Sequence, residues 1–368
     1  MTEIAVIGGG YAGLGAIGAL QDVPHVHITL IDPGTGHQLI PELPEALSRH
    51  GSVSNHIVPY DQLLESASVS LVNSRAMSID WTLRTISSAN GSVTAFDWLV
   101  LAAGSEPSLP PIPGLREFAH PLRDAADTLR IKESLRYLKE QRIVVVGGGL
   151  TGVEVAGMLA PDHDVVLIEA AHRLLPALGK GLAEYALRRL QRSGVITTVG
   201  QKVQAVENQL VILERDHYGF DVLIWAGGIT VPTWVKNLGL PLDNRGYPLA
   251  DHYGKVGDQV YVAGDLWRVV VDDHDVAATA QVAALAGTYV GELIARKIQG
   301  EPGGSPFLPR IRGMLISLDP GQGVGWVLHG GIPVRGMSAR TLKSLSFQQY
   351  RQKLARRFNK PWLVGSNL

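Results

Sequence analysis

The chain has 368 residues, of which 45% are hydrophobic and 18% charged, and its formal net charge is −1. This length is enough for two or three domains with substantial cores, and the composition is typical of a folded protein. The balanced charge gives no reason to expect nucleic acid as a partner. The sequence contains no cysteine, which excludes disulfides, thiolate metal sites and cysteine nucleophiles.

The chain opens with MTEIAVIGGG, which we interpret as a strand that leads directly into a glycine turn. A secretory signal would instead show a basic start, an apolar run and a cleavage site, so we expect a cytoplasmic protein. The most membrane-like segment, 276–295, is dominated by Ala, Gly and Thr. Its weak hydrophobicity predicts a buried helix at 276–298 that packs closely on another element, and not a membrane span.

The first glycine turn belongs to a complete nucleotide-binding pattern. A strand at 3–7 precedes Gly8-x-Gly10-x-x-Gly13, a helix at 11–20 and a second strand that ends at Asp32. In this fingerprint the glycines allow a tight turn close to a pyrophosphate, and the acid accepts hydrogen bonds from ribose hydroxyls. Glycines that serve only tight packing are the plainer interpretation, but the ordered arrival of all the parts favours nucleotide binding.

The same pattern returns in the middle of the chain. A strand at 142–146 precedes Gly147-x-Gly149-x-x-Gly152, a helix at 150–160 and a strand followed by Glu169. An acid at this strand end favours an unphosphorylated ribose, and therefore NADH over NADPH, with nearby Arg173 as the counter-indication. Two such sites predict two dinucleotides, so that NADH at the second turn passes hydride to FAD held at the first.

The remaining segments complete two predicted domains. Strands within 97–104, 220–228 and 258–265 each end at glycine, and the proline-rich stretch 105–114 predicts a domain crossing. The short runs MSID and RTIS predict a small antiparallel ribbon. We therefore predict an α/β fold of two Rossmann-like dinucleotide-binding domains, the second inserted in the first. The predicted parts are 1–110 and 244–310 for FAD, 111–243 for NADH, and a C-terminal region at 311–368.

This C-terminal region is basic and includes a predicted amphipathic helix at 342–362. From Pro320 to Leu368 there are eight Lys and Arg residues and no Asp or Glu. A basic amphipathic helix can lie among lipid headgroups, which predicts peripheral membrane contact. Docking of this helix on the protein core is the alternative. The apolar side of the predicted helix consists of Phe347, Tyr350, Leu354 and Phe358.

Two glycine turns together with LVLAAG, IWAGG and VYVAGD resemble the two-dinucleotide flavoproteins of the pyridine nucleotide-disulfide oxidoreductase superfamily, over nearly the whole chain. Its disulfide and sulfide reductases need cysteines that this chain lacks. Within this superfamily the chain is most similar to type II NADH dehydrogenases, the single-subunit NADH:quinone oxidoreductases. The similarity lies in the segments GGGLTGVEVAG, IEAAHRLLP, HQLIPELPEAL and ATAQVAALAG. That resemblance implies non-proton-pumping, two-electron reduction of a membrane quinone at the inner face of the cell membrane, and a homodimer is compatible with it.

The resemblance also implies roles for single residues. Asp265 would hydrogen-bond the ribityl chain of FAD, Gln281 would lie beside the flavin ring at the quinone pocket, and Glu154 would lie where nicotinamide meets flavin. Leu285 stands where the family has a second glutamine, which leaves the identity of the quinone open. Glu154 and Gln281 are the predicted catalytic residues, although Glu154 could simply be an acid favoured by the helix dipole. The cofactor-binding residues are Gly8, Gly10, Tyr11, Ala12, Gly13, Asp32, Ala103, Gly104, Gly264, Asp265 and Gln281 for FAD, and Gly147, Gly149, Thr151, Gly152, Glu169 and Gly227 for NADH.

Reduction of a quinone takes up two protons. His37 and Glu42 are therefore further candidates, beside Glu154, for the groups that transfer these protons, and the alternative for both is a position in a solvated loop. The run DDHD at 272–275 has the composition of a metal site but no partner cluster, so we expect an acidic loop and no metal. Two other activities remain compatible with the sequence. One is reduction of ferredoxin or rubredoxin by NADH, and the other is a non-enzymatic NADH-sensing flavoprotein similar to apoptosis-inducing factor.

Overall fold

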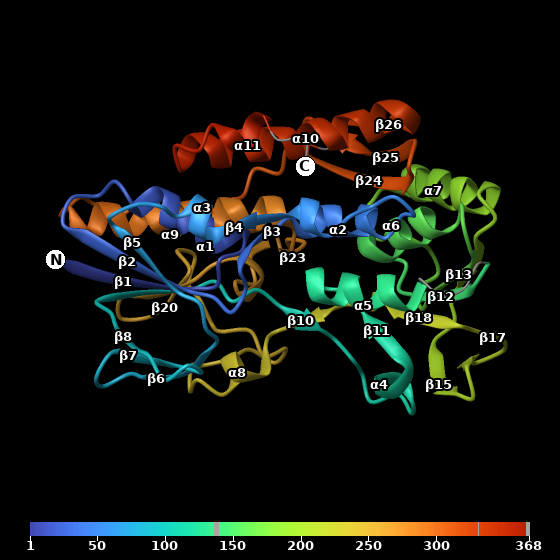
Figure 1. Ribbon diagram of the computed structural model, residues 1–368, viewed down its shortest axis with the longest axis horizontal. Coiled ribbons are helices and arrows are strands. Elements are labelled where there is room, and N and C mark those ends of the chain that lie inside the picture. Colours follow the sequence, from blue (N-terminus) through green and yellow to red (C-terminus); the bar gives the residue numbers. More distant parts are fainter. Residues whose placement is uncertain (136–139, 330, 366–368) are drawn as a thin grey trace.

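The computed structural model describes residues 1–135, 140–329 and 331–365, and two parallel sheets form its two halves (Figure 1). The first sheet has the strand order β20–β21–β9–β1–β2–β5, in which all neighbours are parallel except β20 and β21. Its strands are β1 (Thr2–Ile7), β2 (Val26–Ile31), β5 (Val69–Val72), β9 (Trp98–Leu101), β20 (Lys255–Gly257) and β21 (Val260–Val262).

The second sheet repeats this design in the other half of the molecule. Its order is β11–β18–β12–β13–β14, and every pair of neighbours is parallel. The strands are β11 (Ala119–Pro121), β12 (Arg142–Val146), β13 (Asp164–Glu169), β14 (Ile196–Val199) and β18 (Val222–Trp225). Since all of them lie between two groups of strands of the first sheet along the chain, the second unit is inserted in the first. The exact domain limits stay a prediction.

In each unit a helix follows the central strand directly, as the sequence predicts. Helix α1 (Tyr11–Leu20) follows β1, and α6 (Leu150–Leu159) follows β12. The buried strands are nearly continuous Val, Ile and Leu runs, which is what a parallel sheet covered on both faces requires. The predicted fold class, α/β with two dinucleotide-binding units, is confirmed.

Helix α9 (Ala280–Ile298) packs on α1 at backbone distance. A Cβ added to Gly287 would lie 1.8 Å from the carbonyl oxygen of Ala12, so only glycine permits this approach. The interpretation of 276–298 as a closely packed helix is confirmed, but the helix begins at Ala280, because Thr279 caps it through its hydroxyl. No helix in the described ranges has the length and apolar content that a bilayer span requires.

Short elements fill the space around the two sheets. The predicted ribbon is present, since β6 (Ala76–Asp80) pairs antiparallel with β7 (Thr85–Ser88). At the predicted crossing, β10 (Glu106–Pro107) pairs with β19 (Ile229–Thr230) between the two halves (Figure 1). The other short elements are β3 (Gly36–Gln38), β4 (Ile57–Pro59), β8 (Val93–Ala95), β15 (Val203–Glu207), β16 (Leu210–Leu213), β17 (His217–Gly219), β22 (Val270–Val271), β23 (His274–Asp275), α2 (Leu43–Ala46), α3 (Tyr60–Leu63), α4 (Leu115–Phe118), α5 (Ala125–Leu135), α7 (Lys180–Arg192) and α8 (Thr233–Lys236).

The C-terminal region lies across both halves, along the top of Figure 1. It consists of an antiparallel sheet, β24 (Gly313–Asp319), β25 (Gln322–Val327) and β26 (Ile332–Arg335), and the helices α10 (Gly336–Arg357) and α11 (Trp362–Gly365). Leu354 and Phe358 are buried in the core of the first unit. Part of the apolar side that the sequence assigns to a membrane therefore packs on protein, as in the docking alternative, whereas Phe347 is half-buried and lines a cleft.

We expect Gly287→Ala to lower the free energy of unfolding by about 1–3 kcal/mol, because the added methyl group forces α9 away from α1. The matched control is Gly303→Ala, where a Cβ meets no described atom within 4 Å. Urea unfolding followed by circular dichroism measures both. Equal stability of the two variants would show that the contact between the helices is not close in solution.

Candidate active site

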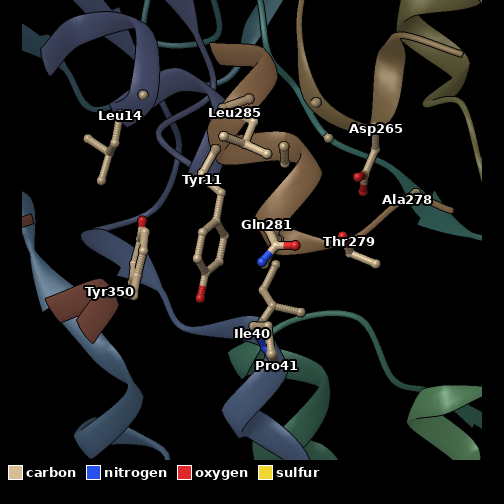
Figure 2. A pocket seen from close by; sticks show the side chains of 18 of the residues that line it. Tyr11, Leu14, Ile40, Pro41, Asp265, Ala278, Thr279, Gln281, Leu285 and Tyr350 are labelled. Atoms are coloured by element: carbon tan, nitrogen blue, oxygen red, sulfur yellow. The ribbon is translucent and has the colours of Figure 1, made fainter. Parts of the chain in front are cut away.

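A cleft of about 2320 Å³ connects the glycine turn of the first unit with the N-terminus of α9 and with α10. Ligand pockets commonly measure about 300–1,000 Å³, so this cleft has room for more than one ligand. Figure 2 shows Tyr11, Gln281 and Leu285 around it, with Tyr350 from α10 alongside. The cleft thus lies beyond the carboxyl end of β1, where open α/β sheets bind ligands.

The first glycine turn has the geometry that a pyrophosphate needs. Gly8 has φ +100°, and a Cβ on Gly13 would lie 1.8 Å from the carbonyl oxygen of Gly8. A Cβ on Gly10, in contrast, would meet no described atom within 4 Å, so this backbone faces open space. The first helical hydrogen bond is donated by Leu14 to Gly10, which leaves earlier N–H groups of α1 directed at the cleft.

The acid at the end of β2 is fixed by the turn itself. Asp32 accepts hydrogen bonds from the N–H groups of Gly9 and Gly34, each at 2.7 Å. Burial raises the pKa of Asp32, and these backbone N–H groups oppose that effect. Asp32 also lines the cleft, so its remaining lone pairs can accept hydrogen bonds from a ribose. This half of the site therefore fits a dinucleotide such as FAD.

The second turn reproduces these contacts almost atom for atom. Gly147 has φ +117°, a Cβ on Gly152 would lie 1.8 Å from the oxygen of Gly147, and Gly149 faces open space among the described atoms. Glu169 accepts hydrogen bonds from Gly148 at 2.5 Å and from Ala171 at 2.6 Å. The residues therefore fit a second dinucleotide, whose site reaches the cleft through Thr151 and Glu154.

Arg173, the counter-indication for NADH, is turned away from this ribose position. Its guanidinium donates hydrogen bonds to the backbone oxygens of Leu178 and Pro176, at 2.9 and 3.0 Å. A 2′-phosphate would need a free cation beside Glu169. The contacts of Arg173 therefore do not favour NADPH.

Asp265 is held by two partners that sequence reasoning did not connect with it. The Ser105 hydroxyl and the Arg123 guanidinium both donate to its Oδ2 atom, at 2.7 and 2.8 Å. Within the described residues Oδ1 has no hydrogen-bond partner, and Asp265 lines the cleft. The carboxylate is therefore fixed in place with one oxygen available to a hydroxyl group of the cofactor.

Gln281, in the first turn of α9, also lines the cleft. Its Oε1 atom accepts a hydrogen bond of 3.0 Å from the backbone N–H of Arg312, so the amide group is oriented with its NH₂ left to donate. Leu285 lies one helical turn further on and is 37% exposed. This face of α9 thus presents one polar and one apolar group to a ligand.

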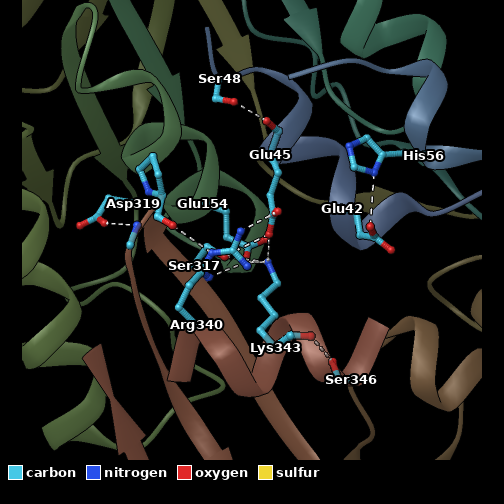
Figure 3. Close-up of polar contacts among 12 residues, drawn as sticks. Glu42, Glu45, Ser48, His56, Glu154, Ser317, Asp319, Arg340, Lys343 and Ser346 are labelled. Carbon is cyan, nitrogen blue, oxygen red and sulfur yellow. Dashed lines mark hydrogen bonds and ion pairs between the residues drawn. The ribbon is translucent and has the colours of Figure 1, made fainter. Parts of the chain in front are cut away.

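Glu154 is buried, and a lysine of the C-terminal helix pairs with it (Figure 3). Lys343 donates to Oε1 of Glu154, which also accepts from the N–H of Ser317 at 2.7 Å. Burial raises the pKa of Glu154, and the Lys343 ammonium opposes that effect. Lys343 also lies 3.6 Å from Glu45, which Arg340 binds at 2.8 Å. A chain of ionisable groups therefore leads from the cleft to the C-terminal region.

His37 and Glu42 do not line the cleft in the described structure. The Nδ1–H group of His37 donates to the carbonyl of Gly9 at 3.2 Å, so Nε2 accepts the hydrogen bond of 2.9 Å from the Tyr350 hydroxyl. Glu42 pairs instead with Arg351 at 2.8 Å and with His56 at 3.3 Å. Both residues therefore attach the N-terminal unit to its surroundings, and neither occupies a solvated loop.

Most predicted residues of the FAD site meet at the cleft, whereas the NADH turn touches it at its edge. Gly13 and Gly152 serve the packing of turn against helix. Three functional residues were missed: Arg123, Ser317 and Lys343. Only Lys343 carried a signal, the basic composition of the tail, and that signal pointed to lipid. The predicted cofactor and catalytic roles stay proposals.

The first half of the DDHD run, Asp272 and Asp273, forms the turn between β22 and β23, and His274 and Asp275 make up β23. Asp275 pairs with Arg245 and Arg268 at 2.7 and 2.8 Å. The expected acidic loop is therefore limited to the first two residues of the run. Within the described ranges no group of three His, Cys, Asp or Glu residues could hold a metal.

Two acid-terminated glycine turns beside one cleft define an NAD(P)H-dependent flavin oxidoreductase. The chain belongs to the pyridine nucleotide-disulphide oxidoreductase family, whose model matches residues 2–287. The sequence is 26% identical over 355 residues to an NADH dehydrogenase-like protein of Bacillus subtilis, covering 94% of this chain and 97% of that one. It is 23% identical to a type II NADH:quinone oxidoreductase of Staphylococcus saprophyticus, covering 93% of each.

The fold agrees with these relatives. The structure of NDH2 from Plasmodium falciparum in complex with NADH superimposes with a TM-score of 0.84 at 16% identity, covering 97% of this chain and 96% of that one. The resemblance to type II NADH dehydrogenases that the motifs indicate is confirmed. Family membership also confirms the coarse cofactor assignment, FAD with NAD(P)H.

The buried imidazole predicts a pH dependence of stability. Burial lowers the pKa of His37 to about 4, below its usual value of 6.5. Between these values the unfolded chain binds a proton that the folded chain does not, so stability falls as pH falls, by on the order of 3 kcal/mol over the window. We expect His37→Asn to remove this part of the pH dependence in urea unfolding between pH 4 and pH 7. His217→Asn, at an exposed position of β17, is the control, and an unchanged pH profile of His37→Asn would contradict the assignment.

Proposed function

We propose that this protein is an FAD-dependent NADH:quinone oxidoreductase, which converts NADH, a proton and a quinone into NAD⁺ and the quinol. The observation that carries the proposal is that Glu154, from the inserted unit, and Gln281, from α9 of the outer unit, line one cleft with the first glycine turn. FAD, when bound, supplies the chemistry of accepting a hydride and passing on two electrons. The residues of the chain supply binding, orientation and protons.

The donor is proposed to be NADH. Two backbone N–H groups fix the Glu169 carboxylate, and this charge would repel a 2′-phosphate. The engagement of Arg173 with backbone oxygens supports the same choice.

Glu154 is proposed to hold and move the proton that quinone reduction consumes. Burial raises the pKa of the Glu154 carboxyl group and so favours its protonated form, and Lys343 is placed to exchange that proton with it. Glu45 and Arg340 continue the chain of ionisable groups away from the cleft. The Gln281 amide would donate a hydrogen bond to a quinone oxygen and so orient the ring.

Membrane contact is proposed to involve the rim of the cleft, and not the buried side of α10. Four exposed leucines line this cleft, together with the exposed cations Arg310 and Arg356. Apolar groups beside cations are the combination that binds the headgroup region of a bilayer. The leucines are Leu285, Leu308, Leu328 and Leu345.

Stopped-flow spectroscopy tests the activity. We expect NADH to bleach the flavin absorbance of the holoenzyme faster than equal NADPH, and menadione, but not ferredoxin, to restore the absorbance rapidly. In Glu154→Gln the reoxidation by menadione should slow about 100-fold, because the proton donor is lost. The matched control is Glu292→Gln, which removes an exposed carboxylate from the same cleft. Rapid reoxidation by ferredoxin alone, or a long-lived reduced flavin with every acceptor, would contradict the proposal.

Cosedimentation with liposomes tests the membrane contact. We expect Leu328→Ser combined with Leu345→Ser to reduce binding to phosphatidylglycerol vesicles several-fold while menadione reduction in solution is retained, because each leucine buries apolar surface in lipid. Leu83→Ser, an exposed leucine on the turn between β6 and β7, is the control. Unchanged sedimentation of the double variant would assign any lipid binding to another surface.

A further inference from the structure

Several cations that line the cleft have no carboxylate partner among the described residues. Arg312, Lys353 and Arg357 all line it, and within the described residues none of them forms an ion pair. Four other cations of the C-terminal region form ion pairs, whereas within the described residues Arg335 and Arg356 do not. The engaged cations are Arg340 with Glu45, Lys343 with Glu154, Arg351 with Glu42 and Lys360 with Glu65.

Lys353 and Arg357 lie one turn apart on α10, and Arg312 is near enough for its charge to act on Lys353. Burial lowers the pKa of Lys353, and the charges of Arg312 and Arg357 lower it further. Both charges that act on Lys353 are positive, so the chain itself does not neutralise this cluster. Such an arrangement destabilises the protein unless an anion binds to it.

Arg357 is held in place by its side chain, whereas Arg312 is anchored through its backbone, and both contacts are to elements that line the cleft. Arg357 donates from Nη1 to the Thr288 hydroxyl at 2.8 Å and to the oxygen of Gly15 at 3.2 Å, which leaves its other N–H groups for a ligand. The backbone N–H of Arg312 binds the side chain of Gln281 at 3.0 Å. The cluster is therefore attached to the residue that we propose orients the quinone.

We propose that Arg312, Lys353 and Arg357 bind an oxyanion group carried by the electron acceptor. This inference rests on the proposed function and names the class of its substrate, a quinone with a carboxylate or similar anionic substituent. Guanidinium groups match the planar geometry of such oxyanions, and Lys353 adds a point charge.

Leu285 fits this assignment. It presents an exposed apolar side chain at the cleft one helical turn beyond Gln281, so that this position offers a quinone ring no hydrogen bond. Recognition of charge by the three cations supplies specificity in its place. A lipid phosphate would present the same chemistry, but the hydrogen bond from the backbone of Arg312 to Gln281 places this residue beside the proposed acceptor site, which favours an acceptor over a lipid.

Steady-state kinetics of the holoenzyme with 1,4-naphthoquinone-2-sulfonate and with menadione test the inference. We expect the wild type to have the lower KM for the sulfonate. Lys353→Gln and Arg312→Gln should each raise KM for the sulfonate about tenfold, the loss of one charge-assisted hydrogen bond, and leave KM for menadione within twofold. Lys353→Arg, which keeps the charge, should retain the preference.

The matched control is Lys297→Gln, which removes one exposed positive charge from the end of α9, outside the cleft. It should leave both KM values unchanged, whereas a rise for the sulfonate in this variant as well would reduce the effect to general electrostatic steering and overturn the inference. Equal KM changes for both acceptors in Lys353→Gln would overturn it too.

Binding to liposomes distinguishes the two possible oxyanion ligands, an anionic electron acceptor and a lipid phosphate. Loss of binding of Lys353→Gln to phosphatidylglycerol vesicles, with unchanged KM for the sulfonate, would assign the cluster to a lipid phosphate and overturn the inference. If NADH reduces the flavin and neither quinone reoxidises it, the proposed function fails as well. If menadione reoxidises the flavin and the KM for the sulfonate does not change when Lys353 or Arg312 is substituted, only the inference fails.

Discussion

The molecule depends on one backbone contact, made twice. In each unit the third glycine of the turn approaches the oxygen of the first so closely that a Cβ would lie 1.8 Å from it. This approach brings the start of the helix against the end of the central strand and directs its free N–H groups at one point. The same contact between Gly13 and Gly8 and between Gly152 and Gly147 gives two anion-binding ends in one chain, and the cleft lies where they can act together.

The C-terminal region contacts both units and so holds their site residues in one arrangement. Tyr350 binds His37 of the outer unit, and Lys343 binds Glu154 of the inserted unit. One helix, α10, therefore fixes groups from both units with hydrogen bonds that are buried, where a lost partner is costly. Four basic residues of this region form ion pairs with acids of the two units, whereas Arg312, Lys353 and Arg357 line the cleft without one.

The sequence was sufficient for the parts of the structure that local chemistry determines. Glycine spacing, apolar runs and a terminal acid predict β1, α1 and β2 with their limits, because each is specified by neighbouring residues. The pairing of Arg123 with Asp265, and of Lys343 with Glu154, could not be predicted, because the partners are far apart in the chain and no spacing rule connects them. The C-terminal helix shows the same limit, since its apolar stripe is compatible with both lipid and protein, and only the three-dimensional structure shows that Leu354 packs in the core.

The insertion of one unit into the other has a consequence for how the chain acquires its structure. The strands of the second sheet all come from one continuous stretch, whereas β9 of the first sheet must pair with β21 on the far side of that stretch. Pairings between distant segments form slowly, because the loop between them must first be closed. The nicotinamide half is therefore expected to become protected from hydrogen exchange earlier during refolding than the sheet that surrounds it. The proposed flavin site combines residues from before and after the inserted stretch, so flavin uptake is expected only after β9 and β21 have paired.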